Sequence, residues 1–315
     1  MHPVLAIDVG GTKYAAGLVA PDGTVVSSRR VPTPQGADAE TLWLALESLI
    51  DAVVDDAGGS TVDGVGVGAS GPMEWPAGLL SPLNIPGWRA FPLLARIAAK
   101  LPGVPVRIHN DAICLALAEH WRGAGRGHDN MIGMVVSTGV GGGLILGGRA
   151  VDGATGNAGH IGHIVVVPDG QACGCGGRGC LEAETRGPRV TAWAVREGWQ
   201  PPADTEANPS ARDLAHSARA GDPIAIGAYE RAGSLLGLGI ASAVALTDVD
   251  LVVIGGGLSQ AGPLLFGPLR ASYRRHARID FARSVSVVPA ELNQDAGLVG
   301  AAALVARADR YWSRA

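Results

Sequence analysis

The chain has 315 residues, of which 47% are hydrophobic, 17% charged and 4% aromatic, and its formal net charge is -4. This composition excludes a disordered or fibrous protein, and the weak negative charge gives no electrostatic basis for binding nucleic acid or an anionic membrane. No basic segment precedes the first apolar run, and the longest apolar stretch, residues 232–247, is too short to span a bilayer. We therefore expect a cytoplasmic protein with about two domains.

The N-terminal part of the chain predicts a strand, a glycine turn and a second strand. Residues 4–7 form a continuous apolar run, which is typical of a strand buried on both faces. The sequence Asp8-Val9-Gly10-Gly11-Thr12-Lys13 then separates this run from a strand over 14–19. The patterns that follow predict a third strand over 24–31, a helix over 41–57, strands over 62–67 and 104–108, and a helix over 112–121.

The opening pattern recurs in the second half of the chain. An apolar strand over 131–136 leads into the turn Ser137-Thr138-Gly139-Val140-Gly141-Gly142-Gly143, and a strand resumes over 144–146. Further on we expect a surface loop over 200–210, a buried helix over 224–246, a strand over 251–254 that ends in Gly255-Gly256-Gly257, and a closing helix over 295–308. The repeat predicts two related α/β lobes. We place one lobe at residues 1–122, completed by the C-terminal helix 296–315, and the other at residues 123–295.

The two glycine turns predict a nucleotide site. Glycines bare backbone N–H groups that bind phosphate oxygens, Thr12 and Lys13 add donors, and Asp8 offers a carboxylate for a magnesium–phosphate complex. Neither turn has the spacing of a P-loop or of a dinucleotide fingerprint, so each turn taken singly is explained equally well as an ordinary hairpin. Their pairing favours a nucleoside triphosphate bound with Mg²⁺.

Asn110 and Asp111 follow a predicted strand and precede a predicted helix. One explanation is a helix N-cap, because aspartate is favoured there. A carboxylate in this place is also able to deprotonate a hydroxyl that attacks a γ-phosphate. Asn84 lies in the rigid segment Leu83-Asn84-Ile85-Pro86-Gly87-Trp88, where it is either an ordinary loop residue or a group that recognises a sugar hydroxyl. The residues alone leave both alternatives open.

A cysteine-rich segment predicts a structural zinc site. Cys173, Cys175 and Cys180 are close together in the sequence, and His163 precedes them. One imidazole and three thiolates form the ligand set of a closed tetrahedral zinc site, and the glycines between the thiols allow the backbone to turn tightly. A disulfide with a spare thiol is the weaker alternative in a chain without a secretion signal. Because Glu182 follows soon after the last thiol, the metal would also hold this carboxylate in place.

Together these motifs resemble those of the ROK family of sugar kinases and sugar-responsive repressors, over essentially the whole chain. The resemblance rests on D-V-G-G-T-K at 8–13, L-N-I-P-G-W at 83–88, N-D-A at 110–112, S-T-G-V-G-G-G at 137–143, A-G-H-I-G-H at 158–163, C-G-C-G-G-R-G-C-L-E at 173–182 and V-I-G-G-G-L-S at 253–259. The family belongs to the actin-like, hexokinase-type ATPases. The resemblance therefore implies a two-lobed, ribonuclease H-like α/β fold with mixed sheets flanked by helices.

The resemblance also implies that ATP phosphorylates the 6-hydroxyl of a hexose or an N-acylhexosamine, with Asp111 as the catalytic base. The sugar would be bound by Gly71, Asn84, Asn110, Asp111, His160, His163 and Glu182. The nucleotide with its Mg²⁺ would be bound by Asp8, Gly10, Gly11, Thr12, Lys13, Thr138, Gly139, Gly141, Gly255, Gly256 and Gly257. A homodimer is implied by the resemblance alone.

The chain departs from the family pattern at four positions. His160 stands where the family has a glutamate that binds hydroxyls near C1 and C2 of the sugar, so glucose is our first candidate and N-acetylmannosamine or N-acetylglucosamine the alternative. Ser70, Glu184 and Arg186 replace a proline, a tyrosine and a serine. A sugar-sensing repressor or an inactive sensor is the second interpretation of the chain. We favour a kinase, because Asp111 is present and the first glycine motif starts too early for a preceding helix-turn-helix segment.

Overall fold

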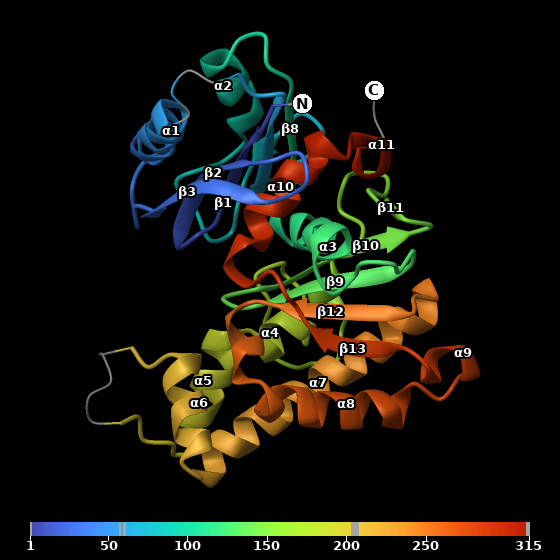
Figure 1. Ribbon diagram of the computed structural model, residues 1–315. Helices are drawn as coiled ribbons and strands as arrows, with labels where there is room; N and C mark the ends of the chain where they lie inside the picture. Colours follow the sequence, from blue (N-terminus) through green and yellow to red (C-terminus); the bar gives the residue numbers. More distant parts are fainter. Residues whose placement is uncertain (1, 57, 59–60, 203–207, 313–315) are drawn as a thin grey trace. The chain divides into compact units, whose positions relative to one another are not determined.

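The computed structural model describes residues 2–56, 58, 61–202 and 208–312. The chain forms two compact units (Figure 1). The first comprises Met1–Asp129, Gly143–Ala158 and Glu291–Ala315, and the second comprises Asn130–Gly142 and Gly159–Ala290. Each unit is therefore assembled from segments that are distant in the sequence.

The first unit is built on a five-stranded mixed sheet in the order β3–β2–β1–β4–β8. Its strands are β1 (Val4–Val9), β2 (Lys13–Val19), β3 (Val25–Pro32), β4 (Gly64–Ala69) and β8 (Val106–Asn110). β1 pairs antiparallel with β2 and parallel with β4, and β4 pairs parallel with β8. The carboxyl ends of three parallel strands therefore meet at one edge of the sheet, where Asp8 and Asn110 lie.

A second five-stranded sheet repeats this arrangement in the order β11–β10–β9–β12–β13. Its strands are β9 (Met131–Val136), β10 (Val140–Leu146), β11 (Arg149–Ala150), β12 (Leu251–Gly255) and β13 (Ser286–Pro289). β10 pairs antiparallel with β11, whereas β12 pairs parallel with both β9 and β13. The two similar sheets confirm the predicted α/β class.

Helices and short strands complete the two units. In the first unit these are α1 (Ala39–Asp56), α2 (Leu93–Lys100), α3 (Asp111–Arg122), η3 (Asn293–Asp295), α10 (Ala296–Ala306), α11 (Ala308–Tyr311) and the small sheet of β5 (Met73–Glu74), β6 (Leu79–Leu80) and β7 (Phe91–Pro92). In the second unit they are η1 (Ile161–His163), α4 (Leu181–Thr185), α5 (Gly187–Arg196), α6 (Ala211–Arg219), α7 (Pro223–Thr247), η2 (Gly257–Ala261), α8 (Pro263–His276) and α9 (Asp280–Arg283).

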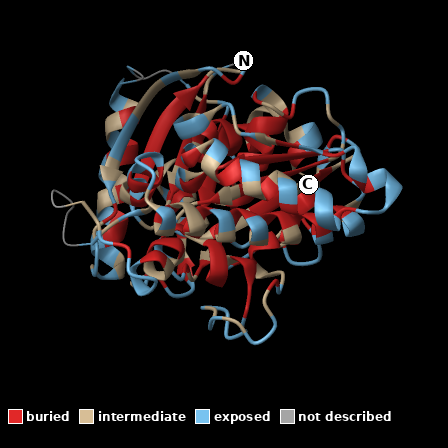
Figure 2. Ribbon diagram, turned by 90° about the horizontal axis from the view of Figure 1, so that it is seen from below, coloured by how far each residue is buried: buried red, intermediate tan, exposed pale blue. Residues whose placement is uncertain are grey.

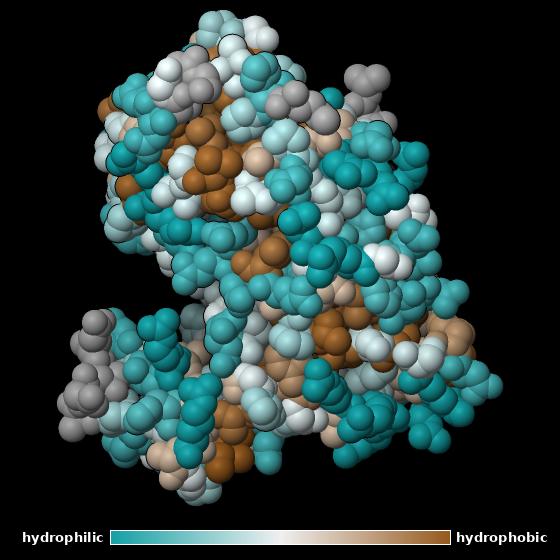
Figure 3. Space-filling view, in the orientation of Figure 1, coloured by the Kyte–Doolittle hydropathy of each residue, from teal (hydrophilic) through white to brown (hydrophobic). Residues whose placement is uncertain are grey.

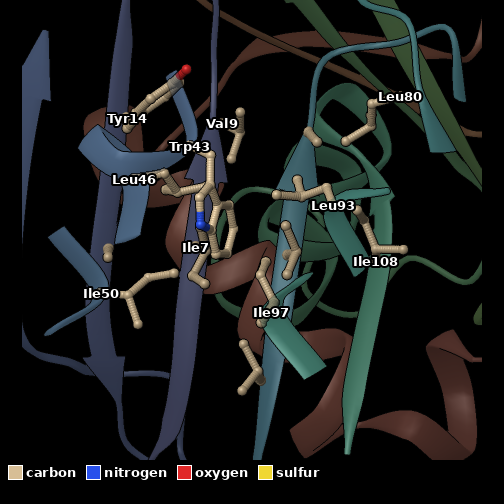
Figure 4. Close-up of a cluster of buried hydrophobic side chains, with 14 of the residues drawn as sticks. Ile7, Val9, Tyr14, Trp43, Leu46, Ile50, Leu80, Leu93, Ile97 and Ile108 are labelled. Atoms are coloured by element: carbon tan, nitrogen blue, oxygen red, sulfur yellow. The ribbon is translucent and has the colours of Figure 1, made fainter. Parts of the chain in front are cut away.

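The first sheet is covered on both faces because apolar residues alternate in direction along its strands. Ile7 and Val9 of β1 belong to a core cluster with Leu46 of α1 and Ile97 of α2 (Figure 4), whereas Ala6 belongs to a cluster with α10. Burying a large apolar side chain such as these stabilises the fold by about 1.5–3 kcal/mol. Figure 2 shows the result, with buried residues on the strands and exposed residues on the outer sides of the helices.

Helix α10 packs unusually close to its neighbours, β4 and α3, beside which it lies in Figure 1. A Cβ placed on Gly66 of β4 would lie 1.9 Å from the carbonyl oxygen of Ala301, and a Cβ placed on Gly300 would lie 1.8 Å from the carbonyl oxygen of Cys114. Both distances are far below van der Waals contact. Glycine is required at these positions because backbone meets backbone there.

Most elements predicted from the sequence are confirmed, with ends that differ by a few residues. The glycine turn predicted over 137–143 is wrong in its second half, because residues 140–143 already belong to β10. Gly142 and Gly143 serve close packing there: a Cβ on either would lie within 2.8 Å of a backbone atom of Gly159 or Ile113, respectively. The expected closing helix ends at Ala306. Residue 57 and part of the predicted loop, 203–207, lie outside the described residues.

The surface in Figure 3 is mainly hydrophilic, with separate hydrophobic patches. Large apolar side chains that are exposed include Leu246 at the end of α7 and Val26 in β3. Among the described residues, no helix combines the length and the apolar character that crossing a membrane requires.

The packing of α10 predicts a large difference between two glycine-to-alanine substitutions in helices. Gly300→Ala should destabilise the protein by about 1–3 kcal/mol, the usual effect of overpacking. The matched control is Gly227→Ala in α7, where the nearest atom to a new Cβ is 3.9 Å away. The control should be neutral or stabilise by up to about 1 kcal/mol, because alanine favours helix. Urea unfolding of both variants measures the difference, and equal stabilities would contradict the close-packing argument.

Candidate functional site

Asp111 is the first residue of α3 and directly follows β8. Its Oδ2 accepts a hydrogen bond from the Ser70 hydroxyl at 2.8 Å, and its Oδ1 accepts one from the backbone N–H of Ala112 at 2.8 Å. Asn110 is the N-cap, since its side-chain oxygen also accepts from the Ala112 N–H at 3.0 Å. The capping role thus belongs to Asn110. The carboxylate of Asp111 lies at the helix N-terminus, where the helix dipole favours a negative charge.

Ser70 and Asn84 extend this polar cluster. The Asn84 amide donates to the Ser70 hydroxyl at 3.4 Å, and a Cβ on Gly11 would lie 2.7 Å from the Asn84 side chain. The first glycine turn, the Asn84 loop and Asp111 are therefore neighbours within the first unit. Ser70 was not among the predicted site residues. The signal that could have indicated Ser70 is its departure from the family pattern, which has a proline at this position.

His109 is a second residue of this region that the sequence did not single out. It is fully buried, its Nδ1 accepts the backbone N–H of Asn110 at 2.9 Å, and its Nε2 lies 3.1 Å from Oδ1 of Asp152. Because Nδ1 is an acceptor, the proton of the neutral ring is on Nε2 and is donated to Asp152. The Trp75 ring stacks on His109 with centroids 5.1 Å apart. These contacts fix the backbone just before Asn110 and Asp111.

Asp8, at the end of β1, lies beside the start of α10. A Cβ on Gly297 would lie 2.4 Å from Oδ2 of Asp8, so glycine is required to admit the carboxylate. Burial, and then the nearby Asp111 carboxylate, raise the pKa of Asp8 to about 7. Burial, followed by the charges of Asp8 and Asp111, also raises the pKa of the Cys114 thiol. Two carboxylates and a thiol thus share one buried region of the first unit.

The first glycine turn joins β1 to β2 and is closed by hydrogen bonds. The Gly10 N–H donates to the carbonyl of Lys13 at 3.1 Å, and the Thr33 hydroxyl donates to the carbonyl of Gly10 at 2.7 Å. Thr12 and Lys13 are exposed. Gly71 lies close to Asn110, since a Cβ on Gly71 would be 3.1 Å from its side-chain nitrogen. The first unit therefore gathers the residues predicted from its own segments at one edge of the sheet.

In the second unit, Glu182 lies against the second glycine turn. Its Oε2 accepts the backbone N–H of Val140 at 2.9 Å and would lie 2.9 Å from a Cβ on Gly139. The N–H of Gly187, the first residue of α5, donates to the carbonyl of Ser137 at 2.8 Å. Thr138 lies between these contacts. The start of α4 and the start of α5 are therefore both attached to this turn.

The predicted glycines after β12 also lie against this turn. Gly256 has a φ of +95°, and a Cβ placed on it would lie 2.5 Å from the carbonyl oxygen of Val136. A Cβ on Gly257 would lie 3.5 Å from the Ser137 hydroxyl. Gly255 ends the strand, and Gly141 lies in β10. Two glycine-rich segments thus meet in the second unit. Such segments expose backbone N–H groups, as a phosphate-binding surface requires.

His160 is the N-cap of the short helix η1, and His163 is its last residue. Their rings stack with centroids 5.9 Å apart and an interplanar angle of 25°. A Cβ on Gly162 would lie 1.9 Å from the carbonyl oxygen of Val140, so η1 packs directly on β10. This close packing brings both imidazoles to the strand that follows the second glycine turn.

The four predicted metal ligands come together. The ligand atoms of His163, Cys173, Cys175 and Cys180 all lie within 4.8 Å of one another. Cys175 Sγ and Cys180 Sγ are 3.8 Å apart, and so are Cys173 Sγ and His163 Nδ1. A tetrahedron with zinc–sulfur bonds of about 2.3 Å has edges of about 3.8 Å. None of the four cysteines, all within the described residues, is in a disulfide, so the set fits a tetrahedral metal ion.

Glycines allow the cysteine segment to fold back on itself. Gly176 and Gly179 have φ values of +92° and +68°, which glycine adopts readily. The carbonyl of Gly179 accepts the N–H of Val166, and a Cβ on Gly179 would lie 1.7 Å from the carbonyl oxygen of Val167. The turns bring Cys175 back toward Cys180. The segment therefore forms a candidate metal-binding loop between η1 and α4, called the metal-binding loop below.

Both units thus present polar or glycine-rich surfaces at the ends of parallel strands, where open α/β sheets bind their ligands. The model of the ROK family matches residues 4–308. The chain belongs to the ROK family.

Several proteins similar to this chain are sugar kinases. A glucokinase of Streptomyces coelicolor is 35% identical over 320 aligned positions, covering 98% of this chain and 99% of that protein. An N-acetylmannosamine kinase of Shigella flexneri is 36% identical, covering 96% and 97%. Among solved structures, a ROK family glucokinase from Streptomyces griseus in complex with glucose and AMPPNP is 33% identical, with a TM-score of 0.83 over 97% of this chain and 99% of that one. These similarities confirm the actin-like ATPase fold that the sequence motifs implied.

The raised pKa of Asp8 predicts a pH-dependent effect of Asp8→Asn on stability. The folded state holds the Asp8 proton more tightly than the unfolded chain, so this carboxyl costs stability as the pH rises from about 4 to about 7. Asparagine avoids this cost. At pH 8 the variant should be more stable by on the order of 1–2 kcal/mol, less than the full shift would give because solvent reaches part of Asp8.

The advantage of Asp8→Asn should shrink toward pH 4, where the wild-type carboxyl is protonated in the folded state. Urea unfolding of both proteins at pH 4.5 and pH 8 measures this trend. A stability difference that is the same at both pH values would show that burial of the Asp8 charge is not its cause.

Proposed function

We propose that this protein is a sugar kinase that transfers the γ-phosphoryl group of ATP to the 6-hydroxyl of a hexose. Glucose is the first candidate substrate, and N-acetylmannosamine or N-acetylglucosamine is the second. The observation that carries the proposal is the Asp111 carboxylate, held by Ser70 and Ala112 at the start of α3 beside Asn84 and Asn110, in a chain of the ROK family. The names of its relatives support the same activity.

Asp111 acts as the general base in this proposal. The 6-hydroxyl oxygen attacks the γ-phosphorus, the bond from that phosphorus to the β-phosphate oxygen of ADP breaks, and the hydroxyl proton passes to Asp111. The Ser70 hydroxyl donates to one oxygen of the Asp111 carboxylate. The other oxygen accepts the N–H of Ala112 at the start of α3, so both oxygens are held in place. Asn84 and Asn110 orient the sugar through hydrogen bonds from their amides, and Gly71 allows Asn110 to come close.

The glycine segments bind the nucleotide in the same proposal. The N–H groups of the turns at Gly10–Thr12 and Thr138–Gly141 and of Gly255–Gly257 would contact phosphate oxygens, with Lys13 as a cationic donor. Mg²⁺ neutralises charge on the transferred phosphates, and Asp8 would hold it. The ionised form of Asp8 is needed for this role. Because burial disfavours this ionised form, the proposed role of Asp8 in nucleotide binding lowers the stability of the folded protein.

His160, His163 and Glu182 recognise the sugar near its anomeric end. A neutral imidazole both donates and accepts hydrogen bonds, whereas a carboxylate only accepts. His160 is thus able to donate to an acetamido carbonyl as well as bind a hydroxyl, which keeps the N-acetylated hexosamines as alternative substrates. The stacking of His160 on His163 supports its place at this end of the site.

Zinc is the metal we propose for His163, Cys173, Cys175 and Cys180. The support is the donor set of one nitrogen and three sulfurs together with separations that match a tetrahedron. With four protein ligands and no open position, the ion would be structural and would hold the loop before Glu182. In this proposal the zinc ion takes no part in the phosphoryl transfer, which depends on the side chains described above.

The proposal also includes a homodimer in the cytoplasm, with functional lobes at residues 1–122, completed by the C-terminal helix 296–315, and at residues 123–295. The dimer rests on family resemblance alone, whereas the location is an expectation from the composition and the apolar segments of the sequence.

A coupled assay of ADP release over a panel of sugars tests the proposed activity. Glucose should give the highest kcat/KM, with N-acetylmannosamine and N-acetylglucosamine as the comparison. Asp111→Asn keeps the shape of the side chain but removes the base, so turnover should fall by at least about 100-fold. A folded Asp111→Asn protein with near wild-type turnover would refute the role of Asp111. Sugar binding without turnover of any sugar by the wild type would instead identify a sensor.

Metal analysis tests the zinc proposal. We expect one zinc ion per chain in the wild type, loss of zinc in Cys175→Ser, and a lower melting temperature, because a structural metal contributes to folding. Cys114→Ser is the matched control, since Cys114 is a buried cysteine outside the cluster and its replacement should leave the zinc content unchanged. Purified wild type that contains no zinc and keeps full activity would refute the proposal.

A further inference from the structure

Helix α4 carries the candidate sugar ligand Glu182 but has only five residues, Leu181–Thr185. A helix this short is not stable by itself, because helix nucleation is unfavourable and few hydrogen bonds follow it. Its N-cap, Cys180, makes no side-chain capping hydrogen bond. The orientation of α4, and with it that of Glu182, must therefore come from tertiary contacts.

Glu184, one of the departures from the family pattern, supplies such a contact. Its side chain is only 2% exposed, and its Oε1 accepts the backbone N–H of Gln171 in the metal-binding loop at 2.7 Å. A Cβ on Gly170 would lie 2.4 Å from the same oxygen, so the loop backbone lies directly on the carboxylate. Glu184 thus joins α4 to the loop that holds the predicted metal ligands.

Arg231 of α7 holds Glu184 from the other side. Its Nη2 donates to Oε2 of Glu184, and its Nη1 donates to the main-chain carbonyl of Glu184 at 3.1 Å. The guanidinium therefore fixes both the side chain and the backbone of one α4 residue. The backbone of Arg231 is held in place, because α7 is 25 residues long and packs along α8.

Little space is left beside this pair. The cavity beside it has a volume of about 10 Å³, room for roughly one water molecule, and it is lined by Gln171, Ala183, Glu184, Arg189, Trp193, Arg196 and Arg231. The Glu184 side chain is 2% exposed and that of Arg231 31%, so loss of Arg231 would leave a buried carboxylate without its counter-charge. The pair therefore resists displacement of α4 relative to α7.

We infer that Glu184 and Arg231 are positioning residues that hold Glu182 in place for sugar binding, as an anchor separate from the metal site. A metal bound by the cluster would fix α4 at its start through Cys180, and the Glu184–Arg231 pair fixes it near its end. Two points of attachment determine the direction of a short helix, whereas a single point would let it rotate. This inference rests on the proposed function insofar as Glu182 binds the sugar.

Three variants test this anchor. Glu184→Gln keeps an acceptor for Gln171 but removes the charge that Arg231 binds, and Arg231→Lys keeps the charge but not the paired donors. Arg196→Gln is the control, because Arg196 lines the same cavity, is exposed, and makes no hydrogen bond to Glu184 among the described contacts. Amide hydrogen exchange over residues 163–185 and binding of glucose and of AMPPNP are measured for each protein.

We expect faster exchange of the Gln171 amide and roughly tenfold weaker glucose binding in Glu184→Gln, a difference of about 1.4 kcal/mol. AMPPNP binding should be retained, because the second glycine turn has its own closing hydrogen bond from Ser137 to Gly139. Arg231→Lys should fall between wild type and Glu184→Gln, and Arg196→Gln should equal wild type.

Two results would overturn the inference: unchanged exchange of the Gln171 amide in both anchor variants, or equal weakening of glucose and AMPPNP, which indicates general destabilisation. If Glu184→Gln does not fold, Arg231→Lys decides by the same criteria. A wild type that binds neither glucose nor the N-acetylated hexosamines would refute the proposed function, whereas the exchange measurement would still decide whether the pair anchors the loop.

Discussion

The close approach of α10 to β4 and α3 is the constraint on which the first unit depends. Where Gly66 and Gly300 allow backbone to touch backbone, no side chain separates the C-terminal helix from the sheet. Asp8 and Asp111 both lie beside this contact, one next to Gly297 and the other at the start of α3. The packing that closes the core therefore also sets the separation of the two carboxylates.

That placement has an energetic cost. A buried carboxylate is destabilised by loss of hydration and by a like charge nearby, and Asp8 experiences both effects. Proteins commonly retain such a cost where function needs the charged group. Asp111 is in a different situation, because its carboxylate accepts hydrogen bonds from a hydroxyl and from a backbone N–H at the start of α3. Two neighbouring carboxylates thus differ in their environment and are suited to different tasks.

The second unit also positions a carboxylate, but it does so through contacts from several segments of the chain. Its sugar-binding candidate, Glu182, is on a helix too short to orient itself, so the direction of that carboxylate depends on its contact with Val140, on the metal ligands and on Arg231. Each of these contacts comes from a different segment of the chain. The glycines of the metal-binding loop make the arrangement possible, because they remove the side chains that would keep those segments apart.

The sequence by itself determined the α/β class, most strands and helices, and the four residues of the candidate metal site, because periodicity and ligand spacing are local properties. It also identified Asp111 and the glycine turns as candidates, through motifs a few residues long. It did not identify Ser70, His109 or Arg231 as neighbours of the candidate site. Ser70 contacts Asp111 across 41 positions, and Arg231 contacts Glu184 across 47. Only the tertiary structure decided these pairings, because such contacts arise from the packing of whole helices and strands, which no local pattern encodes.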